Sequence, residues 1–466
     1  MDVSHLTDDI NKLVALASTS GCDVEGKRRH AIDGLQVSTF MPHVVANEAD
    51  RTARILNAIA TILVRRPRGG VFAVGARIIH SEKLQEGSVQ LFLAGNNNIP
   101  YEMKQYLEDV WQIMQKMADE NRKKLARTPM RRKDYFEINP PKDNNGHATE
   151  LPASYLELMR KVYIHGSKKF LQRLNKLYSA LLEFMNVFLH HVMPHIEDNH
   201  DDYALLDDMV YIQDEIEWMN TQLEDSEDRD KSLELMSNEE FLIRMGKVGS
   251  MINDLSSIKF VRLDVLNEAD KQTRKSISHR VKKFGALQFA IVQLERFTRS
   301  PRFYRILKKT SVEVICVGKS EIPVTLPSDT TGWRKVLESA LDASSYEMNE
   351  KSEVIISKAT PQLKKSKRKK YPVHCECNLL KYFVAADFKP RPVSYIGVSK
   401  LSCAACAAVF GAWNDLHQDH QFKIKGSHGK WYSPWLRQWD GKINQLMREN
   451  CTPQYTKIFR TRLHMH

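Results

Sequence analysis

Apolar side chains recur with two different periods along the chain, and each change of period predicts a change of secondary structure. In residues 47–66 the apolar positions repeat at helical spacing, and Pro67 ends the run. Two β-rich runs follow at 71–79 and 89–93, separated by a polar turn and closed by a row of asparagines. The pattern therefore predicts a helix followed by a β-hairpin within residues 47–98.

A long helical region comes next. Leucine, methionine and phenylalanine recur at helical spacing from 101 to about 125 and from 153 to about 298. Residues 134–150 between them carry paired prolines and an Asn-Asn-Gly run, which indicate a loop. Several antiparallel helices around a shared apolar core would bury such stripes. We therefore assign the stripes to packing and give them no chemical role.

The pattern changes again near residue 311, where short strands and helices begin to alternate. The predicted strands are 312–317, 322–326 and 393–398, and the predicted helices begin near 332, 379, 403 and 435. Such an alternation is typical of an α/β (α+β mixed) fold. We divide the chain into an N-terminal region at 1–100, a helical region at 101–304 and a C-terminal region at 305–466.

Charge adds a partner class to this picture. The 466 residues carry a formal net charge of +12, which favours a polyanionic partner such as nucleic acid, although a solvated basic surface also explains it. The lysine-rich run at 364–370 fits a nuclear localisation signal, a phosphate-contacting arm or a solvated loop. The most apolar windows reach about half a bilayer-spanning length. We expect no membrane segment, no signal peptide and an intracellular protein of the cytoplasm or nucleus.

The cysteines gather in one short region. There are seven in the chain, an odd number, and four of them lie between 375 and 406. This distribution indicates a metal cluster in a reducing compartment rather than a framework of disulfides.

Two motifs in that region carry candidate chemistry. His374-Cys375-Glu376 is separated by 26 residues from Cys403-Ala404-Ala405-Cys406. His374, Cys403 and Cys406 are ligands of the type that Zn²⁺ prefers, and three protein ligands leave one position open for water. Glu376 follows His374 at the start of a predicted helix, where its carboxylate can move protons beside the metal. The motifs therefore predict a hydrolytic zinc site.

A second arrangement of the same cysteines predicts a different site. Four thiolates from Cys375, Cys377, Cys403 and Cys406 would close the coordination shell of a structural zinc ion and leave no position for water. The chain would then be a non-catalytic helical interaction protein with a zinc-stabilised C-terminal region. In a helical register, however, Cys375 and Cys377 point away from the side of Glu376.

The motifs and their flanks resemble the cytidine deaminase-like superfamily, and within it a nucleic-acid/nucleotide deaminase family common in fungi. The resemblance covers roughly residues 305–440 and is carried by three runs: 374–380, 395–403 and 426–430. It implies a three-layer α/β/α domain and zinc-dependent hydrolytic deamination of a cytosine- or adenine-type base in a nucleotide or nucleic acid. The broad superfamily has proline before the first cysteine; Ser402 stands here, as is usual in the fungal-type branch.

The resemblance also implies further elements and residues. The fold would open with a helix and two antiparallel strands, which residues 47–98 supply if the helical region is a large insertion. The alternative is that 312–326 supplies those strands and that the N-terminal region is separate. In the first arrangement Asn96 and Asn97 are candidates to contact the substrate. Ser402 and His428 are two more, and a plain surface turn explains His428 equally well.

Overall fold

The computed structural model describes most of the chain. Apart from a few single positions, the described residues are 48–67, 70–80, 87–127, 151–187, 200–224, 229–258, 268–301, 310–323, 326–341, 370–428 and 442–447. The lysine-rich run at 364–369 and the predicted start of the last helix near Trp435 lie outside them.

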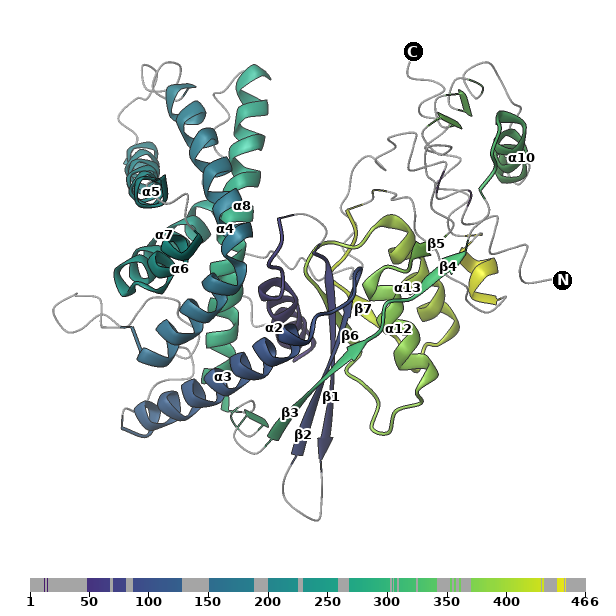
Figure 1. The fold of residues 1–466 in the computed structure, drawn as a ribbon, viewed down its shortest axis with the longest axis horizontal. Coiled ribbons are helices and arrows are strands. Elements are labelled where there is room, and N and C mark those ends of the chain that lie inside the picture. The colour runs from purple at the N-terminus through teal and green to yellow at the C-terminus, as the bar shows by residue number, and fades with distance from the viewer. Residues whose placement is uncertain are drawn as a thin grey trace.

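A mixed five-stranded sheet forms the centre of the molecule, and its order is β3-β2-β1-β6-β7 (Figure 1). Its strands are β1 (Phe72–His80), β2 (Gly87–Gly95), β3 (Thr310–Val317), β6 (Tyr395–Val398) and β7 (Lys423–Ile424). The β1–β2 hairpin is antiparallel, and β1 also pairs antiparallel with β6. The outer pairs β2–β3 and β6–β7 are parallel. The fold is thus of the mixed α/β class expected from the sequence.

The sheet draws strands from both regions that the sequence offered as alternatives. The 72–95 hairpin lies in the middle of the sheet beside β6, whereas β3 is added at the outer edge of β2. The run predicted at 322–326 does not join it. Its described part, β4 (Glu321–Pro323), pairs with β5 (Lys370–Pro372) in a separate two-stranded sheet. The 312–326 segment therefore supplies one strand to the central sheet instead of two.

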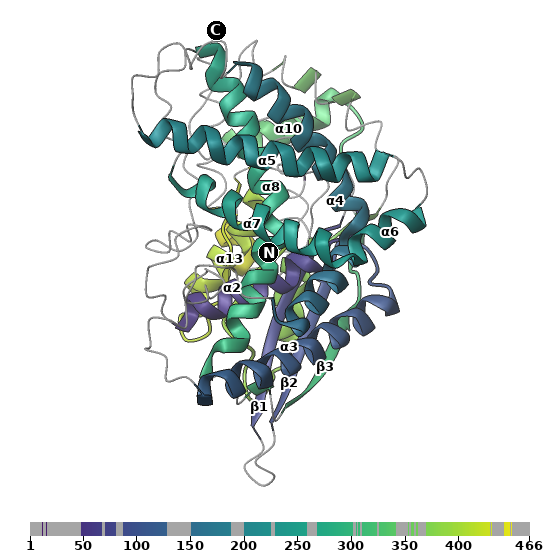
Figure 2. The ribbon, with the colours of Figure 1, turned by 90° about the vertical axis from the view of Figure 1, so that its left-hand side faces the viewer.

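The helical region connects β2 to β3. It comprises α3 (Tyr101–Arg127), α4 (Ala153–Val187), α5 (His200–Glu224), α6 (Arg229–Ser237), α7 (Glu239–Ile258) and α8 (Glu268–Arg299). Because β2 and β3 are parallel, the chain between them must return along the sheet, and here the return is made by these helices. Figure 2 shows α3 in front of the strands, with the other helices above it. In the part of the chain that is described, none of the helices could span a membrane.

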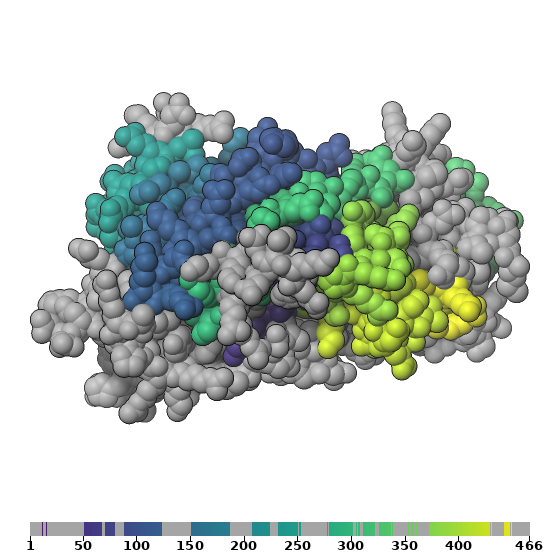
Figure 3. Space-filling view, turned by 90° about the horizontal axis from the view of Figure 1, so that it is seen from below, coloured from purple at the N-terminus to yellow at the C-terminus, as the bar shows by residue number. Residues whose placement is uncertain are grey.

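Helices cover the two faces of the sheet. On one face α2 (Glu48–Ile62) packs against β1, β6 and α8, and α3 packs against β3. On the other face α12 (Cys375–Ala385) packs against β1 and β2, and α13 (Ala404–Leu416) packs against α12. Another helix, α10 (Thr330–Leu341), lies farther from the sheet than α12 and α13 (Figure 1). The helical and C-terminal elements occupy opposite ends of the described molecule (Figure 3).

Two contacts bring α2 very close to the sheet. The side chain of Asn57 donates a hydrogen bond to the hydroxyl of Tyr395 at 2.8 Å and accepts one from the backbone amide of Val398 at 2.9 Å. Between those partners Gly397 faces the backbone of Leu56, and a Cβ on this glycine would lie 2.3 Å from the Leu56 carbonyl carbon. Only a residue without a side chain allows this approach.

Replacing Gly397 with alanine is therefore expected to destabilise the fold by about 3 kcal/mol, because the added methyl group meets backbone that cannot move cheaply. Urea unfolding monitored by circular dichroism would measure the change. Gly411→Ala is the matched control, since a Cβ there meets nothing within 4 Å among the described residues and α13 gains helix propensity. Equal stability of the two variants would contradict the close approach of α2.

A half-buried histidine of α4 contacts α3 and the residue that follows α2. His165 of α4 stacks on Tyr106 of α3 at 3.7 Å between ring centroids, and its Nε2 lies 3.4 Å from the backbone oxygen of Leu63. Burial lowers the pKa of His165 to about 4, and the nearby charges of Arg65 and Lys161 act in the same direction. The folded protein therefore disfavours the protonated ring.

Acidification is expected to weaken the fold through His165. The unfolded chain takes up this proton near pH 6.5, and the folded chain only near pH 4, so the stabilisation is complete above 6.5 and is lost as pH falls towards 4. The loss between pH 7 and pH 5 is at most about 2 kcal/mol. Urea unfolding at both values should show a smaller pH dependence for His165→Gln than for the native protein. An identical dependence would refute the assignment.

Candidate metal centre

The two sequence motifs meet at one edge of the sheet. Strands β2, β3, β6 and β7 all end at this edge, since β2 and β3 run parallel, β6 and β7 run parallel, and β1 is antiparallel to both of its neighbours. His374 immediately precedes α12 and Cys403 immediately precedes α13, so both helices begin here. Helix N-termini carry a partial positive charge, which stabilises thiolates and other anions.

Three side chains converge at this point. The Nδ1 of His374 lies 3.5 Å from Cys403 Sγ and 3.3 Å from Cys406 Sγ, and the two sulfur atoms are 3.4 Å apart. All three ligand atoms lie within 4.8 Å of one another, and both cysteines are buried. His374, Cys403 and Cys406 could therefore hold a metal ion together.

The donor set and its dimensions fit zinc. Bonds of about 2.3 Å to sulfur and about 2.05 Å to nitrogen in a tetrahedral site place two sulfur atoms roughly 3.8 Å apart, and sulfur and nitrogen roughly 3.6 Å apart. The three separations in the structure are shorter by only a few tenths of an ångström. A small outward movement of the side chains would accommodate the ion, with one position left for a further ligand.

The three donors also change one another's pKa values. Burial alone would lower the pKa of His374, but the charges of Cys403 and Glu376 and a hydrogen bond to Cys403 raise it. Burial alone would raise the pKa of Cys403, but hydrogen bonds to Cys406 and His374 and the charge of His374 lower it. Cys403 is thus favoured as a thiolate, which is the form that binds metal.

Glu376 lies in the first turn of α12, and its side chain is 4% exposed. One of its oxygen atoms accepts a hydrogen bond from the thiol of Cys375 at 3.3 Å. Its charge acts on both His374 and Cys403, so the carboxylate lies near the converging ligands without being one of them. A buried carboxylate in this place is suited to proton transfer.

The four-thiolate arrangement is not assembled among the described residues. The thiol of Cys375 is directed to Glu376 instead of the other cysteines. Cys377 hydrogen-bonds to Cys406 but is not within the group of ligand atoms that lie within 4.8 Å of one another. The structure therefore favours the histidine-containing set over the closed set of cysteines.

The two candidate asparagines follow β2 at the same edge of the sheet. Asn96 accepts a hydrogen bond from the backbone amide of Cys375 at 2.9 Å, so its side-chain oxygen satisfies the first amide of α12. Asn97 is exposed. The structure thus gives Asn96 a role in holding the helix that carries Glu376, which the sequence did not predict, and a contact of either residue with substrate stays a prediction.

Ser402 and His428 lie on two backbone segments that pair with each other. The amide of Ser402 donates to Gly426 and the amide of His428 donates to Ser402, at 2.9 and 3.1 Å. This pairing places His428 beside Ser402, the residue that precedes Cys403. The Nδ1 of His428 accepts a hydrogen bond from the backbone amide of Lys430. Ser402 is 2% exposed, and its hydroxyl is a buried group with no hydrogen-bond partner in the described structure. A buried hydroxyl without a hydrogen-bond partner costs free energy of folding unless a ligand supplies that partner.

A further residue that sequence reasoning missed is Asn378, which fixes α12 to the end of β3. Its side chain accepts from the hydroxyl of Ser320 at 2.7 Å and donates to the backbone oxygen of Gly318 at 2.8 Å. Asn378 is 3% exposed. A polar residue among the apolar positions of a short helix was the available signal, but its partners lie nearly sixty residues upstream.

Comparison with known protein families found a match that covers the region of the His-Cys-Cys site. A family model described as "OTT_1508_deam:-like deaminase" matches residues 373–437, which contain both motifs. No curated protein and no solved structure matches the chain. The chain therefore carries a deaminase-like domain that holds the His-Cys-Cys site.

Proposed function

We propose that this protein is a zinc-dependent hydrolytic deaminase of the cytidine deaminase-like superfamily, acting on a base in a nucleotide or nucleic acid. The observation that carries the proposal is the convergence of His374, Cys403 and Cys406 at two helix N-termini beside the buried carboxylate of Glu376. A ligand set with an open position next to a carboxylate suits hydrolysis of an exocyclic amine, whereas a structural zinc site needs neither feature.

Each residue has a defined task in this proposal. His374, Cys403 and Cys406 would hold zinc, which when bound supplies the Lewis acidity that makes water nucleophilic near neutral pH. Glu376 would transfer two protons in turn through a carboxylate oxygen: one from the water to a ring nitrogen, and one from the hydroxyl then attached to the ring carbon to the departing amine, which leaves as ammonia. Asn96 holds α12 so that Glu376 keeps its position. The unpartnered hydroxyl of Ser402 and the ring of His428 are candidates to contact the base.

Mass spectrometry of bases tests the proposal. The zinc-loaded protein would be incubated with free nucleosides, nucleotides, and single- and double-stranded DNA and RNA. Formation of uracil from cytosine or of hypoxanthine from adenine, with release of ammonia, is the expected result. Absence of any deaminated base across this panel, with zinc bound, would favour the alternative of a non-catalytic interaction protein.

A further inference from the structure

A group of cations lies where the helical region meets the edge of the sheet that bears the metal centre. Lys169 and Arg173 belong to α4, Lys283 belongs to α8, and Lys400 follows the end of β6. The charges of Arg173, Lys283 and Lys400 all act on Lys169, and those of Arg173 and Lys400 act on Lys283. We call these four residues the basic cluster.

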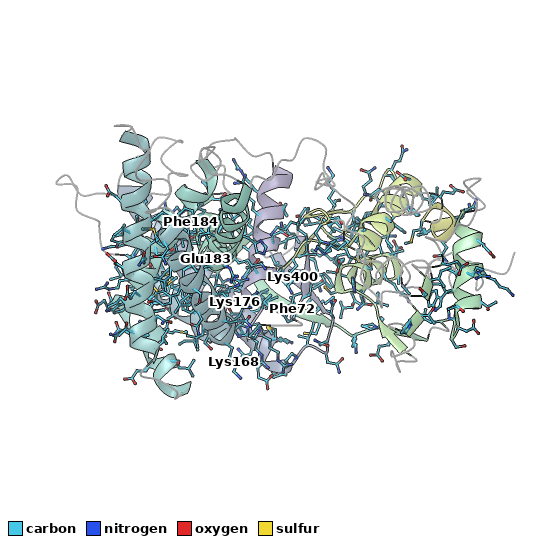
Figure 4. The ribbon with its side chains drawn as sticks, turned by 90° about the horizontal axis from the view of Figure 1, so that it is seen from above. Phe72, Lys168, Lys176, Glu183, Phe184 and Lys400 are labelled. Carbon is cyan, nitrogen blue, oxygen red and sulfur yellow. The ribbon has the colours of Figure 1, made fainter. Side chains whose placement is uncertain are left out.

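Local geometry explains how the basic cluster forms. Lys169 and Arg173 are four residues apart, so they lie one turn apart on the same side of α4. Helix α8 packs against α4, and Arg280 donates a hydrogen bond to the backbone oxygen of Lys176 at 3.1 Å. That contact brings Lys283 to the same side. Figure 4 labels Lys176 of α4, Lys400 and Phe72 in the region where α4 approaches the sheet.

No carboxylate neutralises the basic cluster among the described residues. None of its four members takes part in an ion pair or a side-chain hydrogen bond there. Glu183, which Figure 4 labels about two turns beyond Lys176 on α4, takes part in no ion pair among the described residues. Burial together with the neighbouring cations lowers the pKa of Lys169 to about 6, and burial lowers that of Arg173 to about 10. Without an anion Lys169 is therefore mostly uncharged near pH 7, and an anion bound beside it would restore its charge.

The basic cluster is close to the metal centre. Lys400 is three residues before Cys403, and its charge interacts with both Arg173 and the thiol of Cys375. The residue before it, Ser399, is fixed to the start of β1, because its hydroxyl and amide bond to the backbone of Phe72, each at 3.0 Å. The same edge of the sheet therefore carries a hydrolytic site and, next to it, an unneutralised positive surface.

We propose that Lys169, Arg173, Lys283 and Lys400 bind a phosphate group of the substrate whose base is deaminated at the neighbouring metal centre. The inference rests on the proposed function and deepens it, because it makes the substrate a nucleotide or a nucleic-acid strand instead of a free base or nucleoside. It also gives the helical region a role, since three of the four cations come from α4 and α8.

Phosphate is the anion that this arrangement fits best. Arginine binds phosphate oxygens through two parallel N–H groups, and lysine adds mobile point charges around them. The four basic side chains offer more N–H donors than one carboxylate can accept from, whereas a phosphate accepts several charge-assisted hydrogen bonds. The phosphate of a free nucleotide and the phosphodiester of a strand share this chemistry, and the experiment separates them.

The test is a binding measurement by isothermal titration in the Glu376→Gln background, so that ligand is not consumed. The probes are cytidine and adenosine, their 5′-monophosphates, inorganic phosphate, and single-stranded DNA and RNA oligonucleotides. Phosphorylated probes are expected to bind at least about tenfold more tightly than the nucleosides, and Arg173→Gln or Lys169→Gln to remove that advantage. Binding of monophosphates identifies a nucleotide site, and binding of oligonucleotides alone identifies a strand site.

Two controls separate a ligand site from a structural one. Lys247→Gln removes a charge from an exposed position of α7, outside the basic cluster, and should leave every affinity within about twofold. The thermal midpoint of Arg173→Gln without ligand should equal or exceed that of its parent, because a repelling cation has been removed. A lower midpoint, or unchanged preference for phosphorylated probes in Lys169→Gln and Arg173→Gln, would overturn the proposal.

The binding measurement does not depend on whether the protein deaminates a base. Phosphate-dependent binding that is lost in the cluster variants supports the basic cluster even if no base is deaminated, and the proposed function alone then fails. If the native protein deaminates nucleosides and nucleotides equally well, the phosphate-binding role of the basic cluster is refuted, and the proposed deaminase function stands.

Discussion

Glu376→Gln is expected to reduce the rate of base deamination by about 10²–10⁴-fold while zinc stays bound, because the amide cannot accept and return a proton. Glutamine keeps the size of the side chain, and Glu376 is not one of the three converging ligands. The measurements are the rate of product formation by mass spectrometry and the zinc content by elemental analysis, made on the same preparation.

The control for that variant is Glu217→Gln, which neutralises an exposed carboxylate of α5 in the helical region. Its rate should match that of the native protein. Because Glu376 accepts a hydrogen bond from Cys375, unfolding of the Glu376→Gln protein should be followed as well, to show that α12 is intact. A Glu376→Gln protein that is folded, zinc-loaded and fully active would remove this residue from the proton transfer.

His374→Ala and Cys406→Ser are each expected to weaken zinc binding strongly. Each removes one of three converging donors, so zinc affinity should fall by at least about 100-fold, more than the loss of an outer partner typically costs. A zinc-competition titration with a chromogenic chelator would measure the affinity. Thermal unfolding with and without chelator should then differ for the native protein and coincide for the variants, because only a bound ion stabilises the folded state.

The matched control is the double change Cys375→Ala with Cys377→Ala. These cysteines are equally buried and lie on the same helix as Glu376, but the structure places them outside the converging group. Because Cys377 is only an outer partner of Cys406, zinc affinity should fall much less than in His374→Ala. Loss of zinc in the double variant with retention in His374→Ala would restore the closed site of four cysteines and with it the structural interpretation.

Several features of this protein were accessible from the sequence because they depend on neighbouring residues. The hairpin at 72–95 and the helices on either side of it follow from hydrophobic period and from the turn residues between them. The His-x-Glu and Cys-x-x-Cys motifs indicated their chemistry because ligand type and helical spacing are both local. The deaminase family match over 373–437 agrees with that interpretation.

Other features required the assembled chain. Strand β3 pairs with β2 across more than two hundred residues, and the short run after it pairs with β5 instead, because strand partners depend on which edges remain open after the helices pack. The side-chain oxygen of Asn96 is bound to the amide of Cys375, a contact that spacing alone could not distinguish from a contact with substrate.

The sequence by itself determined the chemical character of the C-terminal motifs: a soft ligand set for zinc with a carboxylate next to it. Tertiary structure decided which cysteines converge with His374, since only the starts of α12 and α13 at one sheet edge bring these atoms together. It also brought Lys169 and Arg173 within electrostatic reach of Lys400, some 230 residues away in the sequence. Ligand type is a property of single residues, whereas convergence and unpaired charge arise from packing between distant segments.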